Sequence, residues 1–334
     1  MARRIIKRNR RELDQGRRFF LTRAGILSGS AALLAAGGYF TYSDQPLRHR
    51  AEPVADLPDF RVERSLHYPM LAIVRGSQVD AMVRQAVEKL GGIGRFINKG
   101  DRVLLKPNVG WDRMPEQAAN TGPEVVGAVV NLCREAGAGA IWVSDISMND
   151  PQRCFSRSGI LQAVQQAGGE VVLCDKEDFR VANMGGDLLK QWPISRFVLQ
   201  ADKIINLPIV KHHSLSGCTL AMKNWYGVLG GRRNQLHQDI HTSIVDLANA
   251  FKPTLTLMDA VRVLKRNGPS GGNPADVARE NTVIASLDEV ALDSFALAFL
   301  GLTPEQVPFL SLAQRRNLGQ VDWRSLHFSE SQIG

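Results

Sequence analysis

Lysine and histidine side chains gather in one short segment, KHHSLSGCTLAMKNW, which runs from Lys211 to Trp225. The segment has no acidic residue, and it follows an apolar run, IINLPIV, that is typical of a buried strand. Burying ammonium groups without partners costs several kcal/mol per group. An anionic ligand would supply the missing countercharge, so the segment predicts a site for phosphate or carboxylate.

A helix start is expected within the same segment. Lys211 and His213 stand at the strand end. We expect a helix to begin near Thr219, with Lys223 and Asn224 one turn into it. Free backbone N–H groups at a helix start bind anions, and the lysines would add charge. The alternative is that the histidines cap backbone groups while the lysines reach solvent.

A second histidine pair suggests a metal site. His237 and His241 are four residues apart, which on a helix places both side chains on one face, as in paired metal ligands. Gln238 stands where the metalloprotease motif has glutamate, so a protease is excluded. Asp259 or His213 would complete the metal shell. Solvent-exposed or capping histidines are the alternative.

Apolar strand-like runs alternate with helical patterns along the chain. The strand-like runs are 70–76, 101–110, 140–147, 170–175, 202–211, 254–261 and 282–289. This alternation predicts an α/β fold with a mostly parallel sheet and helices on both faces. Ligands of such sheets bind at the carboxyl ends of the strands, where this chain carries polar residues. Those residues are Lys106, Asn108, Asp145, Ser147, 211–214, Asp259, Arg262 and Asp288.

A glycine loop, RNGPSGGNP, follows the strand at 254–261. Gly268 and Gly271 permit a close backbone approach to a ligand, so we expect them at the site. A plain surface turn is the alternative. The loop lacks the phosphate-binding pattern of a P-loop, and the chain has no Gly-x-Ser-x-Gly elbow for a hydrolase triad.

The charge of the chain is concentrated at its start. The net charge is +8, and residues 1–23 contain nine Lys or Arg and two acidic residues, a charge of +7. The remaining charge of +1 does not make a broad footprint for nucleic acid, so no nucleic-acid partner is expected. With 334 residues and 44% apolar composition, the chain is long enough for one large domain.

The first 43 residues are similar to a twin-arginine export signal. GRRFFLT at 16–22 resembles its consensus, and the uncharged residues 24–43 are just long enough to span a membrane. We favour retention as an anchor over cleavage. The resemblance implies the export machinery as a partner and a periplasmic or other extracytoplasmic location. Residues 44–69 are expected to be a linker, and 70–334 a single α/β domain.

Four sequence blocks together resemble the domain of unknown function 362 family over about residues 70–302. They are VLLKPNVG, INLPIVKHHSLSGCTLAMKNWYGVLGG, LHQDIHTSIVDLANAFKPTLTLMDAVRVLKRNGPSGG and TVIASLDEVALDSFALAFLG. Exported members of the family are the most similar. The residues that match the family pattern are Lys106, Asn108, Lys211, His213, Lys223, Asn224, Asp259 and Gly268. His212 stands where the family pattern has a small hydroxyl residue.

Iron–sulfur chemistry is implied for many members of this family by a cysteine-rich segment, which this chain lacks. Its four cysteines are scattered at Cys133, Cys154, Cys174 and Cys218, with no C-x-x-C. We expect no iron–sulfur cluster held by these cysteines alone. A redox role would then need a partner's cluster or electron carrier, or another metal.

Two functions are consistent with these patterns. One is an enzyme or redox accessory that acts on a small anion, with Lys211, His213 and Lys223 as candidate catalytic residues. In it Lys106, Asn108, Asp145, Asn224, Gly268 and Gly271 would bind the ligand, and His237, His241 and Asp259 would hold a metal. The other is a non-catalytic, membrane-anchored binding or assembly subunit of a larger complex, such as a membrane redox complex.

Overall fold

One large sheet lies beneath the predicted site. The computed structural model describes residues 54–334, so the predicted signal or anchor at 1–43 lies outside the described residues. The large sheet has ten strands: β2 (Leu71–Arg75), β3 (Arg102–Pro107), β4 (Ala140–Val143), β5 (Glu170–Val171), β8 (Lys203–Leu207), β9 (Ile209–His213), β10 (Gly217–Thr219), β11 (Leu255–Leu264), β12 (Val277–Ser286) and β13 (Phe328–Gln332). Its main order is β13-β2-β12-β11-β8-β3-β4-β5, and β9 pairs with β11 and β10.

The predicted α/β class is confirmed, but the sheet is mixed and not mostly parallel. The strands from β11 through β8, β3 and β4 to β5 pair in parallel. In contrast, β12 is antiparallel to both of its neighbours, β11 and β2, and β10 is antiparallel to β9. The connection from Leu264 to Val277 contains no α-helix, and a parallel crossover usually needs one. This connection, predicted as a glycine loop, joins two adjacent antiparallel strands, β11 and β12.

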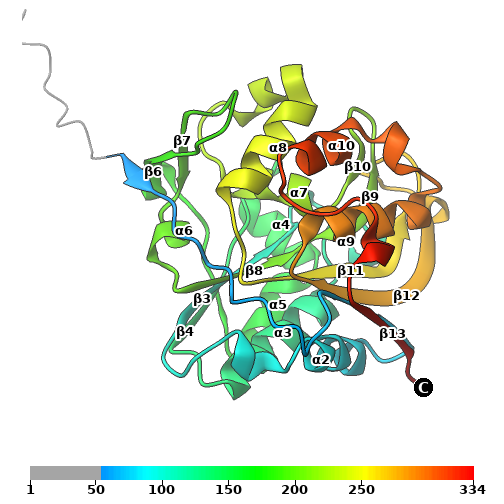
Figure 1. Ribbon diagram of the computed structural model, residues 1–334. Helices are drawn as coiled ribbons and strands as arrows, with labels where there is room; N and C mark the ends of the chain where they lie inside the picture. The colour runs from blue at the N-terminus through cyan, green and yellow to red at the C-terminus, as the bar shows by residue number, and fades with distance from the viewer. Residues whose placement is uncertain (1–53) are drawn as a thin grey trace, which may run out of the picture. The chain divides into compact units, whose positions relative to one another are not determined.

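Alternate residues of the central strands enter two separate hydrophobic clusters. In β3, Val103 and Leu105 belong to one cluster and Leu104 to the other. The cluster with Val103 includes residues of α2 (Val79–Lys89), α3 (Pro123–Glu135), α4 (Pro151–Arg157) and α5 (Ile160–Ala167). The cluster with Leu104 includes residues of α6 (Arg196–Gln200), α7 (Ala221–Asn224), α8 (Ile240–Ala250), α9 (Glu289–Ala296) and α10 (Pro308–Arg315). Figure 1 shows α2, α3 and α5 below the sheet and α8, α9 and α10 above it.

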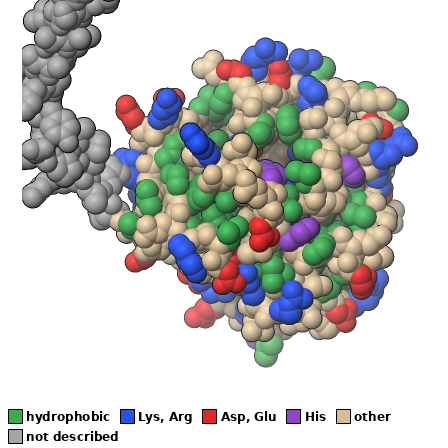
Figure 2. Space-filling view, turned by 90° about the horizontal axis from the view of Figure 1, so that it is seen from above, with side chains coloured by type: hydrophobic (Ala, Val, Ile, Leu, Met, Phe, Trp, Pro, Cys, Tyr) green, Lys and Arg blue, Asp and Glu red, His purple; other side chains and the backbone are tan. Residues whose placement is uncertain are grey.

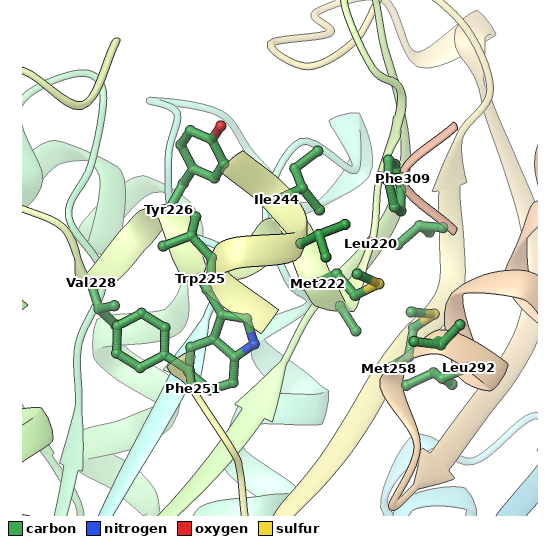
Figure 3. Close-up of a cluster of buried hydrophobic side chains, with 14 of the residues drawn as sticks. Leu220, Met222, Trp225, Tyr226, Val228, Ile244, Phe251, Met258, Leu292 and Phe309 are labelled. Atoms are coloured by element: carbon green, nitrogen blue, oxygen red, sulfur yellow. The ribbon is translucent and has the colours of Figure 1, made fainter. Parts of the chain in front are cut away.

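The apolar side of α7 fixes the position of its polar side. Trp225, directly after α7, is fully buried and stacks on Phe251 with ring centroids 5.1 Å apart. Leu220 and Met222 are also fully buried in the same cluster, which Figure 3 shows in close-up. A side chain packed this closely has little freedom to move. The core therefore holds the adjacent Lys223 in place.

Residues 54–69, the described part of the predicted linker, lie against the folded domain. They contribute β1 (Ala55–Asp56) to a small sheet with β6 (Phe179–Asn183) and β7 (Gln191–Ser195). Phe60 is buried, and its backbone N–H donates to the carbonyl oxygen of Lys252. Within residues 54–334, no helix is long and apolar enough to cross a membrane. All four cysteines are free thiols.

Candidate functional site

Seven of the residues predicted for the site line one pocket of about 280 Å³ at the carboxyl ends of β3 and β9. They are Asn108, Asp145, Lys211, His213, Lys223, Asn224 and His237. On the face shown in Figure 2, Lys and Arg side chains stand mostly at the margin, and histidines lie nearer the middle. The cations of the pocket itself are buried, with Lys211 at 1% and Lys223 at 6% exposure.

Lys106 and Asp145 form a buried ion pair at the base of the pocket. Lys106 Nζ lies 2.6 Å from Asp145 Oδ1 and also donates to the carbonyl oxygen of Pro107. Asp145 Oδ2 accepts from the backbone N–H of Val109. Burial lowers the pKa of Lys106, and the attraction to Asp145 opposes that shift. The charge of Asp145 is therefore matched within the protein.

Among the described residues, Lys211 donates to neutral acceptors alone. Its Nζ donates to Asn108 Oδ1 at 2.9 Å and to the carbonyl oxygen of Ala119 at 2.6 Å. Burial, with the nearby charge of Lys223, lowers the pKa of Lys211 to about 7. A lysine with this pKa exchanges its proton near neutral pH, which is a property of lysines that act in catalysis or in ligand binding.

Lys223 has no hydrogen bond or ion pair among the described residues. Its Nζ lies 4.5 Å from the centre of the Tyr226 ring, a cation–π contact. Burial lowers its pKa to about 8. A buried ammonium group normally has an acceptor for each of its protons. Lys223 lines the pocket, so a ligand in the pocket can provide these acceptors.

The two pocket histidines carry their protons on different nitrogens. His213 Nδ1 accepts from the backbone N–H groups of Leu215 and Ser216, which leaves the proton on Nε2. Burial and the adjacent lysines lower the pKa of His213 to about 2, so its ring is neutral. His237 Nδ1 lies 3.1 Å from the carbonyl oxygen of Asn234, which accepts its proton and leaves Nε2 as a free lone pair.

These two rings are stacked, with centroids 6.2 Å apart and an interplanar angle of 14°. Burial also lowers the pKa of His237. The pocket therefore offers one imidazole that donates through Nε2 and one that accepts through Nε2. The two histidines thus present one donor and one acceptor nitrogen to a ligand that carries a hydroxyl or an acidic proton.

Arg233 adds a cation that the sequence analysis did not single out. Within residues 54–334, its guanidinium donates to uncharged acceptors: the carbonyl oxygens of Tyr226, Ile146 and Ser147, and the thioether sulfur of Met148. It lines the same pocket. Its only signal in the sequence is a second basic residue after a Gly-Gly pair, which is common on surfaces.

Gly227 is a second residue that the sequence analysis missed. A Cβ atom at this position would lie 1.7 Å from Asp145 Oδ1 and 2.5 Å from Lys106 Nζ. The backbone at Gly227 therefore passes directly over the buried ion pair, and only glycine fits. The motif WYGVLGG carried this signal, since a glycine beside buried aromatic residues often marks a close approach.

The start of α7 does not bind the ligand through its backbone, contrary to the expectation for this helix. Asp293 accepts from the first N–H groups, those of Ala221 at 2.7 Å and Met222 at 3.1 Å. Asp293 is fully buried, and burial raises its pKa well above its usual value. A carboxyl group of the protein thus occupies the position that we predicted for an anion. The lysine side chains, and not the helix start, face the pocket.

The three residues predicted to hold a metal do not come together. Asp259 Oδ2 and Oδ1 accept from the backbone N–H groups of Gly122 and Val261. His241 stacks on Phe309, away from His237, because His237 lies on a 3-10 helix that ends before α8 begins. Within residues 54–334, no group of three or more His, Cys, Asp or Glu side chains could hold a metal ion. The predicted set therefore does not form one group of ligands within the described residues.

The glycine loop holds β9 through its backbone. The N–H of Gly268 donates to His212 Nδ1 at 3.2 Å, and a Cβ at this position would clash with the carbonyl oxygen of His212. Gly271 has a φ of +52° and packs against Leu264. Neither glycine lines the pocket, but Pro269 between them does. His212, which stands where the family pattern has a small hydroxyl residue, thus holds this loop by a hydrogen bond.

The fold and the site define an α/β protein with a cationic pocket at the carboxyl ends of its central strands. The chain belongs to the family described as Domain of unknown function (DUF362), whose pattern matches residues 103–298. A thylakoid-associated protein, sll1697 of Synechocystis sp. (strain ATCC 27184 / PCC 6803 / Kazusa), is 30% identical over 248 residues. That alignment covers 71% of this chain and 75% of the relative. The predicted family is therefore confirmed.

Two solved structures resemble the chain at 12% sequence identity. One is the lactate racemase apoprotein from Thermoanaerobacterium thermosaccharolyticum, with a TM-score of 0.39, and the other is a protein from Thermotoga maritima, with a TM-score of 0.35. Each match covers 71% of this chain but only 57% and 58% of those chains. The chain therefore spans less than two thirds of their length.

Proposed function

We propose that the pocket binds a small anion through Lys211, Lys223 and Arg233. The observation that carries this proposal is the burial of Lys223 at 6% exposure with no hydrogen bond or ion pair among the described residues. Asp145 is the one acidic residue among those that line the pocket, and it is paired with Lys106. An anion would offset the remaining positive charge.

The mouth of the pocket favours an anion with an apolar body. Met148 and Leu215 line the pocket and are 58% and 62% exposed, whereas the lysines lie deep. Trp111 and Pro269 also line it. Pockets that bind small molecules commonly combine apolar walls with a few polar groups that fix orientation. A short-chain carboxylate has this character, with its charge at the lysines and its carbon chain at the mouth.

Proton transfer is the chemistry that we propose for an enzyme or redox accessory built on this site. His237 Nε2 would accept a proton from the ligand, while His213 Nε2–H would donate a hydrogen bond to it. Lys211, with its pKa near 7, would stabilise negative charge that develops on the ligand. We assign no role in the pocket to His241 or Asp259.

Calorimetric titration with acetate, butyrate and inorganic phosphate tests the binding proposal. We expect butyrate to bind more tightly than acetate, and Lys211→Ala or Lys223→Ala to weaken binding about tenfold or more while the protein still folds. Lys99→Ala, at an exposed position, is the matched control and should bind as the unmodified protein does. If no probe binds and the pocket variants unfold, the lysines are structural and the proposal is wrong.

A membrane-associated binding subunit is a second candidate, favoured by the thylakoid association for which the relative sll1697 is named. It is consistent with the twin-arginine resemblance at residues 16–22. Fractionation of cells that express the whole chain tests it, with Arg17→Lys and Arg18→Lys together as the variant. We expect the unmodified chain in the membrane fraction on the extracytoplasmic side, and the variant retained inside the cell. A chain that is found in the soluble cell interior in both cases would contradict this candidate.

A further inference from the structure

A row of buried polar side chains crosses the sheet beneath α7 and α9. Strand register pairs Lys106 with Asn206, Asn206 with Thr256, and Thr256 with Ser286. Each of the four side chains is at most 1% exposed. Their neighbours along the strands belong to the hydrophobic cluster that includes α2 and α3. The four polar side chains therefore point to the opposite face, toward the cluster that contains α7 and α9. Apolar residues usually fill such positions, and buried polar groups need partners.

A chain of hydrogen bonds joins this row to the pocket. Lys211 Nζ donates to Asn108 Oδ1 at 2.9 Å, and Asn108 Nδ2 donates to Asn224 Oδ1 at 3.0 Å. Asn224 Nδ2 then donates to Asn206 Oδ1 at 2.8 Å. Asn206 Nδ2 donates to Glu289 Oε1 at 2.6 Å. Every donor in the chain therefore points away from Lys211 and toward Glu289.

The two end groups of this series of hydrogen bonds, Lys211 and Glu289, favour this direction. An ammonium group can only donate and an ionised carboxylate can only accept, whereas an amide side chain does both and can turn either way. Thr256 Oγ1 and Trp225 Nε1 also donate to Glu289, at 2.9 Å each. Burial raises the pKa of Glu289, and the three donors that converge on its carboxyl group oppose that shift by favouring the charged form. With Glu289 charged, Asn206 presents its Nδ2 side, which also donates to the carbonyl oxygen of Ala221 at 3.1 Å.

A second contact supports the same direction at Asn224. Its Nδ2 also donates to the carbonyl oxygen of Lys106 at 3.0 Å, and its Oδ1 also accepts from Lys106 Nζ at 3.3 Å. A reversed Asn224 amide would place an N–H group against the Lys106 ammonium and the oxygen against a carbonyl oxygen. Both contacts would be repulsive.

We propose that Glu289 is a positioning residue that orients the amides of Asn206, Asn224 and Asn108. Through them it presents Asn108 Oδ1 as the acceptor for Lys211 Nζ. Glu289 does not line the pocket, so it acts on a ligand only through this chain. If the amides reversed, Asn108 would turn an N–H group toward the lysine, and Lys211 would lose its proton more readily.

The positioning role rests on the proposed function, because the charge of Lys211 is what would bind the anion. The test of the positioning role needs no ligand. The pKa of Lys211 is measured in the full chain by following its ammonium nitrogen by NMR as pH is varied. We expect Glu289→Gln and Asn206→Leu each to lower the pKa of Lys211 by about one unit. Thr256→Val is the matched control, since it removes a donor to the same Oε1 atom but no amide, and it should change this pKa much less.

Two results would overturn the proposal. An unchanged Lys211 pKa in both variants means that the amide chain has no influence on the lysine. The Lys211 pKa could also shift in Glu289→Gln but not in Asn206→Leu. That result would mean that only the charge of Glu289 acts, because Asn206→Leu interrupts the series of hydrogen bonds and keeps that charge.

A measurement on the unmodified protein tests the proposal even if the variants do not fold. The side-chain amide protons of Asn206 should show nuclear Overhauser contacts with the Glu289 side chain, and a reversed amide would show them with Asn224 instead. Calorimetry with butyrate is a separate experiment. If butyrate, acetate and phosphate all fail to bind while the Lys211 pKa shifts as expected, the proposed function is wrong and the positioning role of Glu289 stands.

Discussion

Lys106 Nζ lies 2.6 Å from Asp145 Oδ1, and both side chains are almost completely buried. The two residues stand 39 positions apart in the sequence, Lys106 within β3 and Asp145 just after the adjacent strand β4. Because Asp145 is matched by Lys106, its charge does not neutralise Lys211 or Lys223. The excess positive charge of the pocket follows from this pairing.

Gly227→Ala should break this ion pair. The new Cβ would overlap Asp145 Oδ1, and separating a buried pair costs about 3 kcal/mol or more of the free energy of unfolding. Urea unfolding measures the loss. Gly94→Ala is the control, because a Cβ there meets no atom within 4 Å. Equal stability of the two variants would show that the pair tolerates displacement.

Lys223→Met should raise stability and weaken anion binding. A buried ammonium without an acceptor destabilises the ligand-free protein, so its removal should raise the free energy of unfolding at pH 7 by about 1 kcal/mol. Butyrate affinity should fall about tenfold, since a charged hydrogen bond is lost. Urea unfolding and calorimetry measure the two effects, with Lys99→Met as the exposed control. A Lys223→Met protein that is less stable than the original would contradict this account.

The pH dependence of stability follows from the lowered pKa values of the two lysines. Lys211 and Lys223 have pKa values of about 7 and about 8 in the folded protein, below their value of 10.5 in the unfolded chain. Between about pH 7 and pH 10 the unfolded state therefore binds more protons, and the free energy of unfolding rises with pH. Below pH 7 the two lysines bind nearly the same number of protons in both states, so they no longer make the free energy of unfolding rise with pH. Thermal unfolding at a series of pH values measures it, and a loss of the rise in a Lys211→Met, Lys223→Met double variant assigns it to these residues.

Binding of butyrate should change in the opposite direction over the same range. The carboxylate stays ionised above pH 6, so only the lysines change charge. We expect affinity to fall by about tenfold or more between pH 6.5 and pH 9 as both lysines lose their protons. Calorimetry at fixed ionic strength tests this. Constant affinity across the range would mean that neither lysine binds the anion.

His213 should stay neutral well below pH 6. Two backbone N–H groups donate to its Nδ1, and burial beside two lysines disfavours the imidazolium, with a pKa of about 2. Nitrogen NMR should show one protonated Nε2 and an unprotonated Nδ1 from pH 8 to pH 5. His213→Gln identifies the signal. A titration of this signal near pH 6.5 would show that the two N–H contacts are not maintained in solution.

Local sequence was sufficient for the class of fold, the family and the core of the pocket. Hydrophobic runs and helical periodicity are properties of neighbouring residues, and they identified the strands that carry Lys106 and Lys211. The gathering of Lys211, His213 and Lys223 in one segment was visible for the same reason. The mixed sheet was not predicted, since antiparallel pairing of β12 depends on which strands become neighbours.

Only the tertiary structure decided which residues share the pocket. His237 and His241 separate because a 3-10 helix ends between them, and Asp259 turns to backbone N–H groups instead. The hydrogen bonds that lead from Lys211 to Glu289 join residues up to 116 positions apart in the sequence, Asn108 and Asn224. A hydrogen bond depends on distance and direction in space, and the order of residues along the chain specifies neither until the strands are paired.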